Sequence, residues 1–381
     1  MPSLKPSILL LGTQMEVAGA QRVLFLLADY LHKNGYSVQA AFVYDKQGLA
    51  AEWQHQHKYP VISLNGWKQD GFVAANLVRL ATAMLRLFAI LRRHQLVITY
   101  TPHSNLLGLP LAWLAGTQVR LGTHHGHIEN APGLLSSLHS QLTNSAACTR
   151  MVCVSSQVRS LAQREGARPE KLVVIDNGIV PPPEIALTAE QKQSLRRSLV
   201  VTQDQLLLVT VGRLMVQKGH TYLLDAIHLL QETNAVFAFV GDGPLREELE
   251  AKASALGLND RVRFIGVRND VAELLTVADV FVQPSLWEGM SLALLEAMFV
   301  GLPVVATRIE ASTDVLEHEQ TGLLVEPQDP ASLADALRRI IGDAELRARL
   351  GRAAQHKARQ SYTVDVMGAA YAGLIKDLHN A

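Results

Sequence analysis

The segment from residue 279 to residue 307 places the strongest constraint on the fold of this chain. Asp279–Gln283 is a short apolar run typical of a buried strand, and Leu292–Phe299 is rich in the good helix formers Leu, Ala, Glu and Met. Ser291 stands directly before that helix, where its hydroxyl can cap free backbone N–H groups. Val304–Thr307 is typical of the next strand. A strand, loop, helix and strand in this order indicate an α/β fold.

The same order of elements occurs at the start of the chain. Ser7–Leu11 is predicted to be a strand ended by Gly12, Gln21–Lys33 an amphipathic helix, and Val38–Val43 the next strand. Such a unit predicts a parallel, doubly wound sheet with a ligand at the strand ends. Gly12 and Gly19 do not have the spacing of the dinucleotide-binding fingerprint, which argues against a dinucleotide oxidoreductase.

The length and composition indicate two globular domains. A chain of 381 residues is long enough for two domains of ordinary size, each with its own core. Hydrophobic residues make up 48% and charged residues 18%, a composition that excludes a disordered protein. Three prolines at 181–183 stiffen the chain where its composition changes. We therefore expect a first domain at 1–183 and a second domain that begins at 184.

The two halves differ in charge, although the formal net charge is zero. Residues 1–183 hold 16 Lys and Arg against 9 Asp and Glu, a balance of +7, and residues 184–381 hold 19 against 26, a balance of −7. A basic first half is suited to an anionic acceptor or to a membrane surface. The alternative is that the opposite charges pair with each other across a cleft.

One predicted helix concentrates basic residues among apolar ones. Asn76–Arg93 contains Arg79, Arg86, Arg92 and Arg93 among Leu, Ala, Met and Phe. A basic amphipathic helix of this kind can lie on anionic lipid. A helix packed on the sheet with its arginines outward gives the same pattern, so the sequence leaves both interpretations open.

The sequence predicts no targeting segment and no membrane-spanning segment. The N-terminus has one lysine and four consecutive apolar residues, Ile8–Leu11, too few for a signal peptide. Phe72–Arg93 comes nearest to a membrane span, but two arginines interrupt it. Cys148 and Cys153 share one apolar stretch and indicate neither a disulfide framework nor a thiolate metal site. We expect a cytoplasmic protein, soluble or peripheral on a membrane.

A cluster of histidines follows the predicted strand Val119–Gly122. It consists of His124, His125 and His127, with Glu129 close behind. Spacings of one and two residues on a loop match no known set of metal ligands, and no further Cys or carboxylate motif completes the set. The sequence therefore predicts no metal site.

Two carboxylates and two cations mark a second candidate site. Glu288 precedes the predicted helix end at Ser291, and Glu296 lies about 7–8 Å further along the helix. A helix N-terminus favours phosphate, and carboxylates accept hydrogen bonds from vicinal hydroxyls. Arg213 and Lys218 lie on a predicted strand-to-helix loop, where together they can offset about two negative charges without a metal. This set suits a diphosphate that carries sugars at both ends.

These motifs resemble one known family. The sequence EGMSLALLEAM followed by GLPVVAT resembles the signature of retaining glycosyltransferases of family 4, nucleotide-sugar enzymes with the GT-B fold. AGAQRVL stands where that family commonly has GGAERVL, and GR-x4-KG matches its pyrophosphate-binding pair. The resemblance covers nearly the whole chain. It implies two Rossmann-like, doubly wound parallel-sheet domains facing a cleft, with a donor domain at 184–360 and a crossover helix at 361–381 that returns to the first domain.

The resemblance also implies a role for each candidate residue. Those implied to act in catalysis are His125, Arg213, Lys218 and Glu288. Those implied to bind the donor are Gly19, Arg213, Lys218, Val267, Glu288, Gly289, Met290, Ser291, Leu292 and Glu296. Within this set Glu288 is implied to hold the sugar hydroxyls and Glu296 the ribose. His127 is the substitute for His125 if the histidine loop is shifted.

The function implied by the resemblance is transfer of a sugar, with retention, from a nucleoside diphosphate to a hydroxyl. The donor is expected to be a UDP-sugar in preference to a GDP-sugar, with no metal and no further cofactor. The acceptor is a glycan, a lipid-linked molecule or a small molecule; no nucleic acid is expected. The enzyme would work in the cytoplasm, with peripheral contact to the inner face of the membrane as a further option. Two alternatives stay open: a nucleotide-sugar epimerase of the same fold, and a catalytically silent binding protein.

Overall fold

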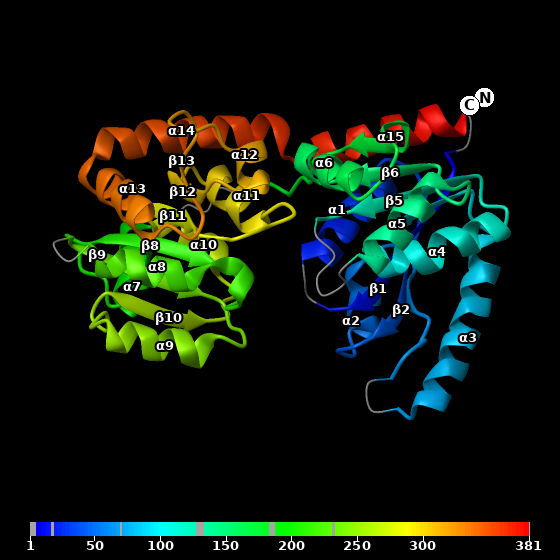
Figure 1. The fold of residues 1–381 in the computed structure, drawn as a ribbon, viewed down its shortest axis with the longest axis horizontal. Helices are drawn as coiled ribbons and strands as arrows, with labels where there is room; N and C mark the ends of the chain where they lie inside the picture. Colours follow the sequence, from blue (N-terminus) through cyan, green and yellow to red (C-terminus); the bar gives the residue numbers. More distant parts are fainter. Residues whose placement is uncertain are drawn as a thin grey trace. The chain divides into compact units, whose positions relative to one another are not determined.

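The protein is described by a computed structural model that covers residues 5–16, 19–68, 71–126, 133–182, 187–230 and 233–380. The chain divides into two compact units, each described by itself (Figure 1). Unit 1 holds residues 1–178 together with 364–381, and unit 2 holds residues 179–363. The sequence predicted divisions at 183/184 and 360/361.

Unit 1 is built on a parallel sheet of seven strands in the order β3-β2-β1-β4-β5-β6-β7. The strands are β1 (Ser7–Met15), β2 (Ser37–Asp45), β3 (Val61–Ser63), β4 (Leu96–Thr99), β5 (Val119–His124), β6 (Arg150–Cys153) and β7 (Leu172–Val174). The order runs outward in both directions from the neighbours β1 and β4, so the sheet is doubly wound. This confirms the sheet type predicted from the sequence.

The connections of unit 1 are mostly helical. They are α1 (Gly19–Lys33), α2 (Ala50–Gln56), α3 (Val73–Leu91), α4 (Pro102–Leu114), α5 (Leu134–Asn144), α6 (Ser156–Arg164) and the 3₁₀ turn Pro169–Lys171, with α15 (Val364–His379) added from the end of the chain. Leu87 and Leu91 of α3 pack against Leu9 and Leu11 of β1 and Val97 of β4, all fully buried. Each such side chain contributes about 1.5–3 kcal/mol through removal from water.

The prediction that Gly12 ends the first strand is wrong. β1 continues to Met15, and Gly12 lies opposite Phe42 in the sheet. A Cβ on Gly12 would lie 2.5 Å from Cε1 of the Phe42 ring. Glycine is therefore required here to accommodate the neighbouring ring, and α1 begins at Gly19, earlier than the predicted start at Gln21.

The predicted crossover segment is not one helix. Ser361 is the last residue of α14 (Ala344–Ser361) in unit 2, whereas Val364 begins α15 in unit 1. The N–H of Ile179 donates to the carbonyl of Tyr362 at 2.9 Å, close to both points where the chain passes between the units. A hydrogen bond thus joins the two chain segments that connect the units, one near residue 179 and the other near residue 362.

Helix α15 packs against α1 within unit 1. Met367, Tyr371 and Ile375 form its buried side. A Cβ on Gly368 would lie 2.2 Å from Cδ1 of the Tyr30 ring of α1, so the two helices approach closely only because residue 368 is glycine. Gly373 on the same helix has no atom within 4 Å of the position of a Cβ.

Unit 2 is built on a parallel sheet of six strands in the order β10-β9-β8-β11-β12-β13. The strands are β8 (Leu206–Val211), β9 (Ala235–Val240), β10 (Val262–Gly266), β11 (Val280–Gln283), β12 (Val304–Thr307) and β13 (Leu323–Val325). The helices are α7 (Ala189–Ser198), α8 (His220–His228), α9 (Arg246–Ala255), α10 (Val271–Val277), α11 (Leu292–Phe299), α12 (Glu310–Val315), α13 (Pro330–Gly342) and α14, with a 3₁₀ turn at Val216–Lys218. The predicted bounds of α11 and β12 are confirmed.

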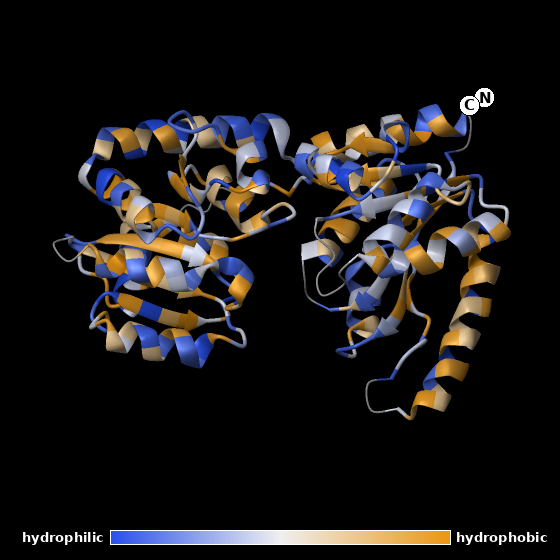
Figure 2. Ribbon diagram, viewed as in Figure 1, coloured by the Kyte–Doolittle hydropathy of each residue, from blue (hydrophilic) through white to orange (hydrophobic). Residues whose placement is uncertain are grey.

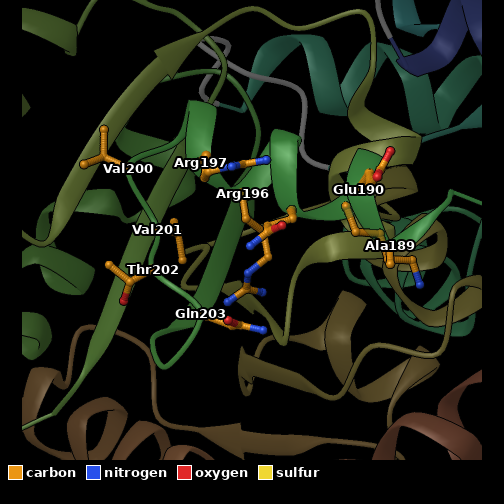
Figure 3. Close-up of a pocket in the computed structure, with 10 residues that line it drawn as sticks. Ala189, Glu190, Arg196, Arg197, Val200, Val201, Thr202 and Gln203 are labelled. Atoms are coloured by element: carbon orange, nitrogen blue, oxygen red, sulfur yellow. The ribbon is translucent and has the colours of Figure 1, made fainter.

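A groove of about 740 Å³ lies beside α7 (Figure 3). It is lined by Ala189, Glu190, Lys192, Gln193, Arg196, Arg197, Val200, Val201, Thr202 and Gln203. Arg196 is not available to a ligand there, because it donates to the carbonyl of Val277 at 2.8 Å and to Asp279 Oδ2 at 3.0 Å. No predicted site residue lines this groove. Arg196 holds α7 to the rest of unit 2.

We predict that Gly368→Ala weakens unit 1, because the added methyl group overlaps the Tyr30 ring. The expected loss is about 1–3 kcal/mol of unfolding free energy. Gly373→Ala is the matched control: it adds the same group to the same helix in open space, and should stabilise the helix by up to ~1 kcal/mol. Denaturant unfolding of both variants measures the difference. Equal stability of the two would show that α15 does not depend on close contact with α1.

Candidate functional site

The candidate site of unit 2 lies where the direction of its strand order changes. β8 and β11 are neighbours, and the order continues from β8 to β9 on one side and from β11 to β12 on the other. In open parallel sheets, ligands bind outside the carboxyl ends of the two strands at such a switch point. The loop at 212–219 follows β8, and the loop at 284–291 follows β11. These two loops carry most of the predicted donor-binding residues.

The two loops touch through their backbones. Gly219 has a positive φ of 63° and directly precedes α8, and a Cβ on it would lie 2.0 Å from the carbonyl oxygen of Pro284. The N–H of Leu286 donates to the carbonyl of Gln217 at 2.7 Å. Residue 219 must therefore be glycine for the loops to meet, and the contact fixes the side chains beside it.

Lys218 and Glu288 form an ion pair across this contact. Lys218 Nζ lies 2.5 Å from Glu288 Oε1, and the two side chains are 19% and 7% exposed. The hydroxyl of Ser285 donates to the same carboxylate oxygen at 2.8 Å, and Gln217 Nε2 lies 3.4 Å from Glu288 Oε2. The carboxylate is thus held in one orientation by its partners. Removal of one partner from a nearly buried ion pair of this kind strongly destabilises the folded protein, because the other charge stays buried without a partner.

Arg213 lies on the same loop but does not join this pair. Its side chain is exposed, and within the part of the chain that the structure describes no hydrogen bond or ion pair engages it. Its guanidinium can therefore bind an anion without breaking an internal contact. Lys218, in contrast, already pairs with Glu288. An anion that binds Lys218 must either share it with this carboxylate or draw it away from the carboxylate.

Helix α11 begins as predicted beside the pair. The Ser291 hydroxyl accepts from the N–H of Leu294 at 3.3 Å and so caps the helix. Gly289, Met290 and Glu296 are half-buried, Ser291 is buried, and Leu292 is half-buried at the first helical position. The free N–H groups of this helix end carry a partial positive charge suited to phosphate.

The loops after β9 and β10 continue the same edge of the sheet. A Cβ on Gly241 would lie 2.0 Å from the carbonyl oxygen of Gly212, and the N–H of Gly241 donates to the carbonyl of Gly266 at 2.8 Å. Val267 follows Gly266 and is 75% exposed. Four loops, those after β10, β9, β8 and β11, are thus packed side by side from Val267 to the Lys218–Glu288 pair.

His220 lies next to the site, although the sequence analysis assigned it no role. It is the first residue of α8, is buried, and its ring is 5.5 Å from that of Phe239. Burial, and then the charge of Lys218, lower the pKa of His220 to about 3. The imidazole is therefore neutral at physiological pH. The only sequence signal was its position directly after the motif that contains Lys218.

In unit 1 the predicted histidine lies at the end of β5. His125 Nε2 is 2.8 Å from the hydroxyl of Thr123, which itself donates to the carbonyl of Thr99 at 2.9 Å. The ring therefore donates to Thr123 from Nε2. Burial, and then the neighbouring His124, lower the pKa of His125 to about 4, so the ring is neutral. Its remaining nitrogen is able to accept a hydrogen bond.

His124 is the last residue of β5 and does not belong to a loop, contrary to the prediction. Its Nε2 lies 3.1 Å from Glu165 Oε2, and its Nδ1 accepts from the N–H of Gly126 at 3.3 Å. It is buried and packs edge-on against His139 at 5.2 Å. His124 thus serves the framework beneath His125.

The remaining predictions concern Gly19, the residues His127 and Glu129, and the metal site. Gly19 is exposed at the start of α1, near the end of β1. His127 and Glu129 lie outside the described residues. Within the described ranges, no group of three or more His, Cys, Asp or Glu side chains is arranged to hold a metal ion.

Comparison with known proteins agrees with this geometry. A family model described as Glycosyl transferases group 1 matches residues 191–357, and one described as Glycosyltransferase Family 4 matches residues 17–181. The chain is 31% identical over 284 residues to the UDP-Gal:alpha-D-GlcNAc-diphosphoundecaprenol alpha-1,3-galactosyltransferase of Escherichia coli, across 71% of this chain and 73% of that one. It is 35% identical over 200 residues, 51% of each chain, to an uncharacterized glycosyltransferase of Methanocaldococcus jannaschii.

Solved structures share the fold over nearly the full length. The Anabaena protein HepE, solved with UDP and glucose, has a TM-score of 0.86 at 23% identity and covers 98% of this chain and 100% of its own. A glycosyltransferase from Rickettsia africae has a TM-score of 0.82 at 19% identity and covers 98% of each chain. The two Rossmann-like units are those of the GT-B fold. The chain belongs to the family 4 glycosyltransferases.

We predict that Glu288→Gln separates binding from turnover. The amide keeps the size of the side chain but removes the charge that Lys218 neutralises, so Lys218 gains attraction for a diphosphate. Affinity for UDP should stay equal or rise, while sugar transfer should fall roughly 100-fold, the scale expected for loss of one transition-state contact. Calorimetry with UDP and steady-state kinetics measure the two effects.

Glu247→Gln is the matched control for that experiment. Glu247 is exposed on α9 of the same unit and is not among the predicted donor-binding residues, so the substitution removes the same charge without breaking the Lys218–Glu288 pair. It should leave both affinity and turnover unchanged. If Glu288→Gln instead loses affinity for UDP and keeps full turnover at saturation, Glu288 does not contact the transferred sugar.

We also predict an acid-dependent loss of stability that involves His139. Its Nε2 lies 2.8 Å from Asn105 Nδ2, so the ring nitrogen must accept, and burial followed by the charge of His124 lowers the pKa of His139 to about 4. An unfolded histidine titrates near 6.5 and so binds more protons between these values. Stability is complete above about pH 6.5 and is lost as pH falls to about 4. At pH 5, His139 should lower the unfolding free energy by about 2 kcal/mol relative to its value above pH 6.5.

The test compares unfolding free energies at pH 8 and pH 5. His139→Gln retains an acceptor for Asn105 but cannot be protonated, so its stability should fall less than that of the wild type. His55→Gln, a change at an exposed histidine of α2, should follow the wild-type curve. Parallel curves for all three proteins would contradict a neutral, buried His139.

Proposed function

We propose that this protein transfers a sugar from a nucleoside diphosphate to a hydroxyl group with retention of configuration. The observation that carries the proposal is the Lys218–Glu288 pair at the switch point of unit 2. The pair puts a cation for a diphosphate directly beside a carboxylate for sugar hydroxyls. The exposed Arg213 and the capped end of α11 add positive charge for the diphosphate at the same strand ends.

We propose UDP as the nucleotide and a lipid-linked or glycan hydroxyl as the acceptor. The Escherichia coli relative is named for UDP-Gal and for an acceptor on diphosphoundecaprenol. Another relative, from Rhizobium meliloti, is a lipopolysaccharide core biosynthesis glycosyltransferase with 34% identity over 179 residues, 47% of this chain and 52% of that one. HepE was solved with UDP-glucose. These names support a UDP-sugar and an acceptor of the cell envelope.

The proposed transfer breaks the bond between the anomeric carbon and the β-phosphate oxygen. The bonding electrons pass to the phosphate, and the acceptor oxygen forms the new bond on the same face of the sugar. The acceptor proton passes to the departing phosphate oxygen, which balances the reaction. Arg213, Lys218 and the N–H groups at the start of α11 are proposed to stabilise the charge that develops on the phosphate.

The remaining residues are proposed to orient the donor. Glu288 accepts from the sugar hydroxyls, Glu296 holds the ribose, and the backbone at Val267 contacts the base. In unit 1, Gly19 allows approach of the backbone to phosphate. His125, with its neutral ring and one nitrogen free to accept, positions the sugar.

We propose that the reaction needs no divalent metal and takes place in the cytoplasm, at the inner face of the membrane. Arg213 and Lys218 together offset about two charges, which is the service that a metal ion provides in other transferases. A lipid-linked acceptor would require the enzyme to work at the membrane surface.

The test uses UDP-sugars and a lipid-linked acceptor, with NMR of the anomeric linkage in the product. Transfer should continue in excess EDTA at an undiminished rate, and the product should keep the configuration of the donor. Abolition by EDTA with recovery on addition of manganese would overturn the metal-free mechanism. An inverted linkage would overturn retention, and release of an epimer without transfer would point to the epimerase.

A further inference from the structure

Helix α3 of unit 1 exposes an apolar surface that nothing in the described chain covers. Figure 2 shows the helix as an almost continuous hydrophobic ribbon. The large exposed side chains on it and directly before it are Phe72 (88%), Val73 (72%), Leu77 (59%), Val78 (67%) and Leu85 (73%). Isolated apolar residues on a surface are normal, but a contiguous set marks an interaction site.

The orientation of α3 is fixed by its other face. Ala83, Leu87 and Leu91 are fully buried against the sheet of unit 1. The side chain of Asn76 accepts from the N–H of Lys68 at 3.0 Å and donates to its carbonyl at 2.9 Å, which ties the start of the helix to the preceding segment. The outward face is therefore presented rigidly and needs no rearrangement to meet a partner.

The basic residues of α3 form a stripe along one side of that face. Arg79 and Arg86 are spaced by seven residues, so at 100° per residue they lie within about 20° of each other around the helix axis, and Arg93 follows two residues after the helix ends at Leu91. All three are exposed. The sequence from Val73 to Leu91 contains no carboxylate. An apolar face with a basic border and no acidic residue fits the surface of an anionic bilayer.

A transmembrane orientation does not agree with the packing. Among the described residues α3 is the one helix long and apolar enough, by length and composition, to cross a membrane. A span would remove Ala83, Leu87 and Leu91 from the core and place Arg79 and Arg86 in hydrocarbon. The helix therefore suits a position in the plane of the interface.

A second copy of the chain fits the surface less well than lipid does. In a two-fold symmetric dimer the same patch appears on both sides. Each basic stripe would then border a patch that offers no carboxylate on α3 to pair with it. Like charges brought together at an interface cost stability. The charge pattern thus favours an anionic partner that is not this chain.

Tryptophans lie on the segments next to α3. Trp67, before the helix, is 42% exposed, and Trp113, near the end of α4, is 51% exposed. Helix α4 packs against α3, and its last residue, Leu114, is also exposed. Tryptophan is enriched where protein meets the headgroup region of a bilayer. These exposed side chains on the neighbouring segments are of a type suited to that depth.

We propose that the outward face of α3 lies on an anionic membrane, with Val78 and Leu85 in contact with lipid chains and Arg79, Arg86 and Arg93 at the headgroups. The benefit for catalysis rests on the proposed function, since membrane binding brings the enzyme to the surface that holds a lipid-linked acceptor. The binding itself requires no donor and no turnover.

The test is flotation of the full chain with vesicles of phosphatidylcholine, with and without phosphatidylglycerol. The protein should float only with the anionic vesicles and should dissociate as the salt concentration rises. Each basic residue near such a surface contributes about a fivefold gain in partition, so Arg79→Glu with Arg86→Glu should lower it about 30-fold or more. Val78→Glu with Leu85→Glu should also abolish flotation.

Two control variants make equal changes elsewhere. Arg159→Glu with Arg168→Glu alters the net charge equally at exposed positions of unit 1, and Leu229→Glu places a carboxylate on an exposed apolar residue of unit 2. Both should float like the wild type. UDP binding and thermal unfolding, unchanged in all variants, show that the loss of flotation is not a loss of fold.

Each alternative gives a distinct result. Equal flotation with neutral and anionic vesicles, or none with either, overturns the proposal. Association into dimers that Val78→Glu with Leu85→Glu disrupts, without vesicle binding, assigns the face to a second copy. Resistance to carbonate extraction assigns it to a membrane span. Because no donor is present, failure of vesicle binding is distinguishable from failure of the proposed transfer.

Discussion

The candidate site depends on close backbone contact between loops that are far apart in the sequence. Gly219 meets the carbonyl of Pro284, and Gly241 meets the carbonyl of Gly212, each at a distance that any side chain would prevent. Both glycines have positive φ values, so other residues would also be strained there. These contacts hold the Lys218–Glu288 pair in a fixed geometry, and they join the pair to the loops after β9 and β10. The charged residues act where they do because the glycines bring their loops together.

Much of the fold follows from local sequence patterns. The alternation of apolar runs with amphipathic helices predicted both doubly wound sheets. The bounds of α11 and β12 agree with the prediction because strong helix formers, a Ser cap and an apolar strand all indicate the same structure. The resemblance of the motifs to family 4 predicted the family correctly. The charged residues of the switch point, Arg213, Lys218 and Glu288, were among the predicted set, whereas Ser285, Gln217 and His220 were not.

What the sequence did not reveal depends on neighbours distant along the chain. Gly12 was taken for a strand end because glycine commonly ends strands, yet its role depends on the Phe42 ring in the next strand. His124 was grouped with a loop, although its burial against Glu165 and His139 keeps it in the sheet. The pairing of Lys218 with Glu288 joins residues separated by 70 positions, and no local pattern encodes that distance. Tertiary contacts decide each of these cases.

The position of α15 in unit 1 has a consequence for how the chain is made. Unit 1 takes its first 178 residues from the start of the chain and its last helix from the end, whereas unit 2 is one continuous segment. Folding during synthesis usually proceeds from the N-terminus, domain by domain. Here unit 2 has all its residues before unit 1 does, because Gly368 can reach Tyr30 only after the whole of unit 2 has been translated. Unit 1 thus begins first but is completed after unit 2. The side of α1 that packs against α15 stays exposed to solvent until the ribosome has synthesised unit 2 and then α15.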